Sequence, residues 1–283
     1  MNISTKKICF IGAGSMAEAI FKGLVEKEIL PVQHISVTNQ QDQNRLNELN
    51  MLYDIQTSNN AVIKKDLIKQ ADILVLAMKP KDAESAFQEL NPLLNETQII
   101  VSVIAGLTIE TIQDLLKTNN PIVRTMPNTS SSIGLGVTGI SFSSNVNEKQ
   151  QQLSLEMFDA IGTTCVVPEN KLEILTGVSG SGPAYFYYMM EAMVQAGVSG
   201  GLSEEQAMDL TKQTILGAAH MVQETGEHPA ELRSKVTSPG GATAKAIEAL
   251  DSHHIHEAVQ KAVYASAEKS KEMGEMIKVS LVK

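Results

Sequence analysis

The feature that most constrains the fold of this chain is a glycine-rich turn close to the N-terminus. An apolar run, residues 8–11, leads into Gly12-Ala13-Gly14-Ser15-Met16-Ala17, and a helical pattern follows. Gly12 permits a tight turn, Gly14 lets the backbone approach a phosphate, and Ala17 lets the helix pack closely on the strand. The N-terminus of that helix offers free N–H groups and the positive end of its dipole to an anion. The turn therefore predicts a dinucleotide-binding site rather than a plain connection from strand to helix.

The composition narrows the classes of partner. Over 283 residues, 43% are hydrophobic and 19% are charged, as in ordinary globular proteins. The net charge of −9 argues against nucleic acid and anionic membranes as partners. No run of about 18 apolar residues predicts a membrane span, and residues 1–7 lack the apolar stretch of a signal peptide. Cys9 and Cys165 lie in apolar, strand-like runs, so we expect buried, reduced thiols and a cytoplasmic location.

Further short apolar runs predict more strands, separated by helical patterns, and hence an α/β fold with a mainly parallel sheet. The predicted strands are 34–38, 71–77, 98–103, 121–125 and 163–167, with 137–142 as an edge strand. Ligands of such sheets bind beyond the carboxyl ends of the strands. We therefore expect one crevice to be lined by Gly12, Asn39, Met78-Lys79, Ile104-Ala105 and Asn128.

The residues after the second predicted strand bear on the choice between NADP and NAD. An acid at this position favours NAD, because it binds the 2′-hydroxyl of the adenosine ribose. Here the strand is followed by Asn39, with Gln40 next to it and Arg45 one turn later. Asn39 can bind either a 2′-hydroxyl or a 2′-phosphate. The pattern favours NADPH and leaves NADH open.

The character of the chain changes near Pro168, which predicts two domains, 1–167 and 168–283. From Lys171 the pattern is helical, and its apolar faces are expected to be buried against a second copy of the chain. Residues 237–243 form a glycine-rich loop that opens a helix. Its backbone N–H groups and the hydroxyls of Ser238 and Thr243 can hold a carboxylate. The alternative is a simple hinge between two helices.

Taken together, these pieces resemble the pyrroline-5-carboxylate reductase family over nearly the whole chain. The matching segments are 11–20, 76–80, 124–129, 179–185, 191–198 and 236–243. The Ser238-Pro239-Gly240-Gly241 loop is the most specific of them. The resemblance implies a Rossmann-like N-terminal domain and an all-helical C-terminal dimerisation domain. It also implies reduction of L-1-pyrroline-5-carboxylate to L-proline with NADPH or NADH, by an interlocked homodimer that often assembles further into a decamer.

The resemblance also implies roles for individual residues. Ser238, Gly241 and Ala242 would hold the substrate carboxylate, Thr243 would hydrogen-bond the ring nitrogen, and Glu169 matches an acidic position near the substrate. The family has an asparagine after the third strand, and both Asn59 and Asn60 are candidates for it. The helix that follows is longer than usual, so the alignment leaves both open. The residues implied to hold the cofactor are Ile11, Gly12, Ala13, Gly14, Ser15, Met16, Asn39, Asn60, Ala77, Met78, Lys79, Pro80, Val103, Ile104, Ala105 and Asn128.

The chemistry of an imine reductase needs neither a metal nor a strong base. A C=N bond accepts hydride best when its nitrogen is protonated or hydrogen-bonded, and Thr243 is the hydroxyl predicted to act there. His253, His254 and His256 lack a carboxylate or cysteine set that would complete a metal site. They are interpreted as a solvated loop, and no metal is expected.

Two other functions fit the same architecture. One is another NAD(P)H-dependent imine or β-hydroxyacid reductase, but those families usually carry a lysine on the first long helix of the second domain. Residues 184–191 contain none. The other is a non-catalytic dinucleotide-binding regulator, which would be expected to have lost the substrate loop. Residues 238–243 are complete, so the sequence favours the enzyme.

Overall fold

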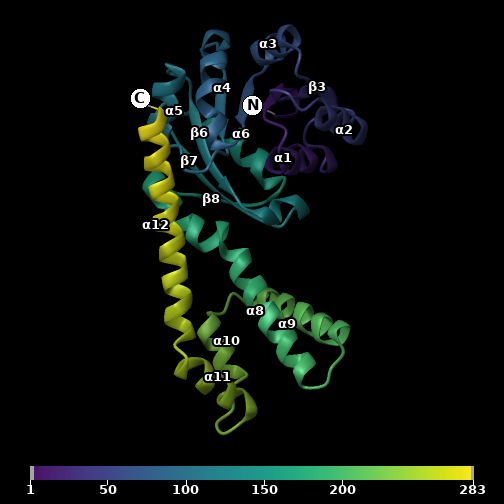
Figure 1. The fold of residues 1–283 in the computed structure, drawn as a ribbon, viewed down its shortest axis with the longest axis vertical. Helices are drawn as coiled ribbons and strands as arrows, with labels where there is room; N and C mark the ends of the chain where they lie inside the picture. Colours follow the sequence, from purple (N-terminus) through teal and green to yellow (C-terminus); the bar gives the residue numbers. More distant parts are fainter. Residues whose placement is uncertain (1–2, 282–283) are drawn as a thin grey trace. The chain divides into compact units, whose positions relative to one another are not determined.

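The structure is a computed structural model, which describes the backbone of residues 3–281 and the side chains of residues 3–278. The chain forms two compact units (Figure 1). The first runs to Gly180 and resumes at Ala265, and the second is Ser181–Tyr264. The first unit contains the sheet, and the second is helical, so the predicted fold class is confirmed.

The first unit is built on one twisted, mainly parallel sheet with strand order β3-β2-β1-β4-β5-β6-β7-β8. All neighbouring strands pair in parallel except β6 and β7, which are antiparallel. Residues 137–142 were expected at an edge, but β7 lies between β6 and β8, and β8 is at the edge. The strands are β1 Ile8–Ile11, β2 Ile35–Thr38, β3 Gln56–Ser58, β4 Ile73–Leu76, β5 Ile99–Ser102, β6 Ile122–Pro127, β7 Gly136–Phe142 and β8 Gly162–Val166.

Helices connect these strands and cover both faces of the sheet (Figure 1). The α-helices that lie wholly in the first unit are α1 Ser15–Glu26, α2 Gln43–Tyr53, α3 Ala61–Gln70, α4 Ala83–Leu90, α5 Ile109–Leu116, α6 Glu148–Asp159 and α7 Leu172–Leu175. Helices α1, α2 and α6 pack on one face, and α3, α4 and α5 pack on the other. The strands are therefore buried on both sides, which explains their continuous apolar runs.

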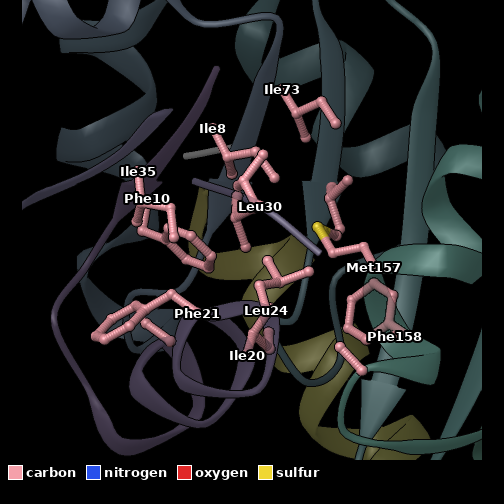
Figure 2. Close-up of a cluster of buried hydrophobic side chains, with 14 of the residues drawn as sticks. Ile8, Phe10, Ile20, Phe21, Leu24, Leu30, Ile35, Ile73, Met157 and Phe158 are labelled. Atoms are coloured by element: carbon pink, nitrogen blue, oxygen red, sulfur yellow. The ribbon is translucent and has the colours of Figure 1, made fainter. Parts of the chain in front are cut away.

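The two hydrophobic clusters follow the alternation of side chains along each strand. Ile8 and Phe10 of β1 belong to the cluster in Figure 2, whereas Cys9 and Ile11 point into the cluster on the opposite face. Phe10 and Phe21 meet edge to face, with ring centroids 5.5 Å apart. Full burial of each such side chain contributes about 1.5–3 kcal/mol. This packing holds the carboxyl ends of the strands in fixed register.

The second unit contains α8 Gly182–Ser199, α9 Glu204–Thr225, α10 Pro229–Lys235 and α11 Ala242–Ser252, together with the start of α12 Ile255–Leu281. Helices α8 and α9 pack side by side. Few of their apolar side chains are buried, and Tyr188 on α8 is 76% exposed. No helix among the described residues is long and apolar enough to cross a membrane.

The compact units differ from the ranges 1–167 and 168–283 that the sequence predicts. The strands do end at Val166, but the segment after them stays with the sheet. Arg124 of β6 forms ion pairs with Glu169 and Glu173, and Asn128 donates a hydrogen bond to the Ser179 carbonyl. These long-range contacts have no local sequence signal.

The two cysteines differ in environment, which gives a first prediction. Cys9 is fully buried, and burial raises the pKa of its thiol to about 11. Cys165 was also predicted to be buried, but it is exposed, because β8 is an edge strand. We expect one thiol per native chain to react rapidly with Ellman's reagent at pH 8, and a second only after unfolding, since the thiolate is the reactive form. Cys165→Ser should abolish the fast phase. A fast phase that persists in that variant would contradict this assignment.

Candidate active site

A cavity of the first unit lies at the carboxyl edge of the sheet and has a volume of about 360 Å³. It brings together residues that are far apart in the sequence. Of the residues predicted to hold the cofactor, those lining it are Ile11, Gly12, Ala13, Gly14, Asn39, Ala77, Met78 and Lys79. Gln40 and Arg45, which follow the second predicted strand, also line it, and the other lining residues are Thr38, Asp42, Lys64, Lys81, Asp82, Ala86 and Glu89.

The glycine turn at this edge has the geometry that a pyrophosphate requires. Gly12 has a φ of +119°, and a Cβ at this position would lie 2.4 Å from the carbonyl oxygen of Ala77. Gly14 stands at the N-cap of α1, and a Cβ there would meet nothing within 4 Å. No side chain caps the helix at Gly14. The N–H groups of the first turn are therefore left for an anionic ligand.

A charged network lies beside this turn. Arg45 donates from Nε to the Ala13 carbonyl at 3.1 Å and forms ion pairs with Glu18 and Glu48. Tyr53 donates to the other oxygen of Glu18 at 2.8 Å. Partial burial raises the pKa of the Glu18 carboxyl, but the hydrogen bonds from Arg45 and Tyr53 outweigh it and lower the pKa overall. Partial burial and the Glu18 carboxylate raise the pKa of Tyr53 to about 12. Glu18 is thus a charged carboxylate whose charge is balanced by Arg45.

The adenosine side of the cavity contains an unsatisfied acceptor. Asn39 donates from Nδ2 to the Asp42 carbonyl at 2.8 Å, which leaves its Oδ1 buried and without a partner among the residues that the structure describes. Such an acceptor fits a ribose hydroxyl, since each buried polar atom is expected to find a partner. Lys64 lines the same part of the cavity and forms an ion pair with Glu89 at 2.8 Å.

The structure uses Asn60 to start a helix. Its Oδ1 accepts hydrogen bonds from the backbone N–H groups of Val62 and Ile63, so Asn60 caps α3. It does not line the cavity, whereas Asn59 lines a neighbouring one of about 540 Å³ with Gln40 and Lys64. Ser15 and Met16 form the first turn of α1, and Pro80 opens the short turn of 3-10 helix that precedes α4.

Other predicted cofactor residues follow β5 and β6, which lie beyond β4 in the sheet as counted from β1. Val103 and Ile104 come directly after β5, and the Ile104 side chain is buried in the hydrophobic cluster under α5. The Asn128 side chain donates to the Ser179 carbonyl and accepts from the Val137 N–H. Both ends of this amide are therefore engaged in holding the segment after β6.

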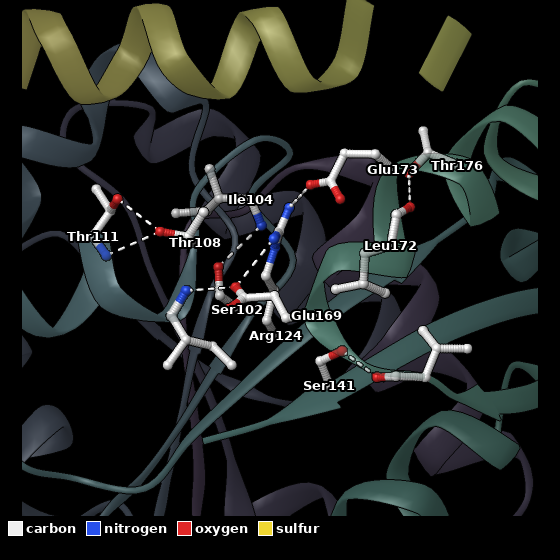
Figure 3. A network of polar contacts seen from close by, with 12 residues as sticks. Ser102, Ile104, Thr108, Thr111, Arg124, Ser141, Glu169, Leu172, Glu173 and Thr176 are labelled. Atoms are coloured by element: carbon white, nitrogen blue, oxygen red, sulfur yellow. Dashed lines mark hydrogen bonds and ion pairs between the residues drawn. The ribbon is translucent and has the colours of Figure 1, made fainter. Parts of the chain in front are cut away.

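Glu169 lies in a polar network beneath α12 (Figure 3). Its Oε1 accepts from the Ile109 N–H at 2.7 Å and from Arg124 at 3.1 Å. Arg124 also contacts Glu173 at 2.9 Å and is 7% exposed. Together with residues of α12 such as Lys271 and Lys278, these side chains line a cavity of about 470 Å³.

The glycine-rich loop of the second unit has the backbone of an anion site. Gly240 has a φ of +72°, and Gly241 is the N-cap of α11, where no side chain caps the helix. The Gly241 N–H donates to the Ser238 carbonyl at 3.0 Å, which closes the turn. Ser238, Ala242 and Thr243 are exposed. His253 and His254 lie between α11 and α12, whereas His256, expected in the same loop, lies in the first turn of α12. No cluster of metal-binding side chains was found within the described part of the chain.

Two family models match the chain. Residues 7–106 match the model described as NADP oxidoreductase coenzyme F420-dependent, and residues 169–273 match the model for pyrroline-5-carboxylate reductase dimerisation. The two matches fall on the dinucleotide half and the helical half. The second indicates that the helical half mediates oligomerisation.

Relatives and solved structures agree with these matches. Pyrroline-5-carboxylate reductase 1 of Bacillus subtilis is 43% identical over 272 residues, which cover 96% of this chain and 91% of that protein. The structure of a pyrroline-5-carboxylate reductase from Coxiella burnetii superposes with a TM-score of 0.88 at 37% identity, over 95% of this chain and 98% of that one. The Plasmodium falciparum enzyme, solved with NADP bound, has a TM-score of 0.85 at 30% identity, over 96% of this chain and 99% of that one.

These likenesses confirm the predicted NADP-dependent reduction of a C=N bond and do not favour the alternative functions. With the cavity and the uncapped helix α1 at the carboxyl edge of the sheet, they lead to one conclusion: the chain belongs to the pyrroline-5-carboxylate reductase family.

Proposed function

We propose that this chain reduces L-1-pyrroline-5-carboxylate to L-proline with NADPH in the cytoplasm, and that its two units bind different reactants. The observation that carries the proposal is the turn at Gly12. There the backbone passes so close to Ala77 that no Cβ would fit, and the uncapped start of α1 lies beside the cavity. The residues present fit a dinucleotide. The pyrophosphate would lie on the turn at 12–14, and the ribose would meet the unsatisfied Oδ1 of Asn39.

The substrate would be held by the second unit. Its carboxylate fits the free N–H groups at the start of α11 and the hydroxyl of Ser238. Thr243, in the first turn of α11, would hydrogen-bond the ring nitrogen. Gly241 and Ala242 contribute only backbone to this binding. Glu169 belongs to the first unit, and its carboxylate already contacts Arg124 and Ile109.

NADPH, when bound, would supply the hydride that the imine carbon accepts. The protein must keep the imine nitrogen protonated, or hydrogen-bonded, while the carbon accepts the hydride. The Thr243 hydroxyl does this by orientation and hydrogen bonding rather than by removing a proton. Holding the reacting carbons about 3–3.5 Å apart supplies much of the rate enhancement. The reaction requires no metal or covalent intermediate.

The direct test of this function is an assay of cofactor oxidation. Purified protein should oxidise NADPH, followed at 340 nm, when pyrroline-5-carboxylate is added, and should form proline in equal amount. NADH should support turnover at lower kcat/KM, because Asn39, rather than the acid that favours NAD, follows β2 in the cavity. The absence of turnover with both cofactors would overturn the proposal in favour of a non-catalytic protein.

The substrate loop gives a prediction that separates binding from catalysis. Thr243→Ala should lower kcat about 10- to 100-fold, because a hydrogen bond to a charged group is worth about 1.5–3 kcal/mol. The affinity for NADPH should stay the same. Ser238→Ala is the matched comparison, and should mainly raise the KM for the imine. An unchanged kcat in Thr243→Ala would rule out its role, and a loss of kcat alone in Ser238→Ala would rule out the carboxylate contact.

An interlocked homodimer is part of the proposal, with a decamer as its further assembly. Large apolar side chains stand exposed on the second unit, such as Phe186 and Tyr188 on α8 and Leu210 and Leu216 on α9. The exposed fractions of Tyr188 and Leu210 are 76% and 59%. Patches of this kind mark protein–protein interfaces, and the family model for this part of the chain describes dimerisation.

We expect sedimentation velocity to show a dimer or a multiple of dimers. Tyr188→Glu should shift the protein toward the monomer, because a charge in an apolar interface costs several kcal/mol when it has no partner. Gln152→Glu on α6 adds the same charge at an exposed position of the first unit and should leave the assembly intact. A wild-type monomer, or a Tyr188→Glu variant with unchanged assembly, would contradict the proposed interface.

A further inference from the structure

We propose that Glu169, held by Arg124, is a positioning residue for hydride transfer. It fixes the loop after β5, residues 103–108, which we call the β5–α5 loop. The inference deepens the proposed function and rests on it, because it concerns the side of the site where the nicotinamide would lie.

The first observation is the charge arrangement around Arg124. This guanidinium leaves β6 on the face covered by α5 and is 7% exposed, so it needs counter-charges in place of water. Glu169 and Glu173 supply two carboxylates for one cation (Figure 3). The excess negative charge lies against the first N–H group of α5, since Glu169 Oε1 accepts from Ile109 at 2.7 Å. The positive end of the α5 dipole stabilises this carboxylate.

The second observation is that the contact between Glu169 and the Ile109 N–H lies at the end of the β5–α5 loop. At the start of the loop, the Ile104 N–H donates to the Ser102 hydroxyl at 3.3 Å. In its middle, Gly106 has a φ of +82° and lies directly against α12, where a Cβ on Gly274 would come within 2.4 Å of the Gly106 carbonyl oxygen. At its end, Thr108 caps α5 and Glu169 binds the next residue, Ile109. The loop is therefore fixed by contacts from strand β5 itself, α12 and the segment after β8.

The third observation is the strand order, which places this loop on the nicotinamide side. The pyrophosphate turn follows β1, and the adenosine side of the cavity, with Asn39, follows β2. In the sheet, β4 and β5 lie on the opposite side of β1 from β2. A dinucleotide whose pyrophosphate lies on the β1 turn must extend its other half over the ends of β4 and β5. The β5–α5 loop then borders the nicotinamide, and its position sets the distance over which the hydride moves.

Glu169→Gln tests this role while keeping the size of the side chain. The amide oxygen can still accept from both the Ile109 N–H and Arg124, as Oε1 does, but it carries no charge, so both contacts weaken and Arg124 loses one of its two counter-charges. We expect kcat to fall about 10- to 100-fold, the range for a mispositioned reacting group. The dissociation constant of NADPH, measured by fluorescence without imine, should change less than about twofold, because Glu169 does not line the cavity that contains the Gly12 turn and Asn39. The deuterium isotope effect with 4-deuterated NADPH should rise, because hydride transfer becomes slower relative to product release.

Arg124→Lys and Asp72→Asn make the test specific. Arg124→Lys retains the charge but loses the fork that reaches two carboxylates, and should show the same pattern more weakly. Asp72→Asn is the matched control, since Asp72 also accepts from a lysine, Lys6 at 2.9 Å, and from a backbone N–H, Lys7 at 2.9 Å, but at the start of β4. It should lower Tm without changing the isotope effect.

The outcomes separate the possible roles. An unchanged kcat and isotope effect in Glu169→Gln would overturn the positioning role. A rise confined to the KM for the imine, with Arg124→Lys behaving as wild type, would also overturn it, because Glu169 would then contact the substrate directly. Glu169→Asp, which keeps the charge on a shorter side chain, repeats the test if the glutamine variant does not fold. A wild-type protein that cannot reduce the imine would instead refute the proposed function.

Discussion

The approach of the Gly12 backbone to the end of β4 is the constraint on which the cofactor site depends. A Cβ at Gly12 would lie 2.4 Å from the Ala77 carbonyl oxygen and 2.6 Å from its carbonyl carbon, which no side chain can tolerate. The Gly12 N–H donates to the Thr38 carbonyl at 2.8 Å, and the Ala77 N–H donates to the Ile11 carbonyl at 2.9 Å. The turn is thus joined to both neighbouring strands of β1. Because the strands are fixed by packing on two faces, the start of α1 is fixed with them, and with it the direction of the free N–H groups.

The sequence predicts those parts of the fold and site whose signals are local. The continuous apolar runs of β1, β4 and β5 and the glycine turn are of this kind, since burial on both faces and a positive φ each demand particular residues. Strand β3 is not among the predicted strands, because Gln56-Thr57-Ser58 is polar and lies at the edge of the sheet. Cys165 was predicted to be buried for a related reason: an apolar run does not reveal that its strand is at an edge with one exposed side.

The contacts that the sequence could not predict are between distant charges. Arg45 reaches back 27 positions to Glu18, Lys64 reaches forward 25 positions to Glu89, and Arg124 lies 45 positions before Glu169. The local pattern of each charge does not identify its partner. Yet Arg45 and Lys64 line the cofactor cavity, and each is balanced by carboxylates. The overall charge of −9 therefore says little about this site, whose charges are balanced locally.

Glu169 lies next to the predicted domain boundary, but its contacts assign it to the first unit. By pattern, it opens the helical half of the chain, and the dimerisation model begins at this residue. By contact, it belongs to the unit that contains the sheet, because its carboxylate holds together a β6 arginine and the first N–H of α5. A buried arginine that lost both carboxylates would be left uncompensated, at a cost of about 3–5 kcal/mol. Ion pairs and a hydrogen bond thus hold the segment 169–180 on the cofactor-binding sheet, and its sequence pattern does not reveal these contacts. The change from strands to helices near Pro168 is a change of secondary structure within one compact unit, not the place where that unit ends.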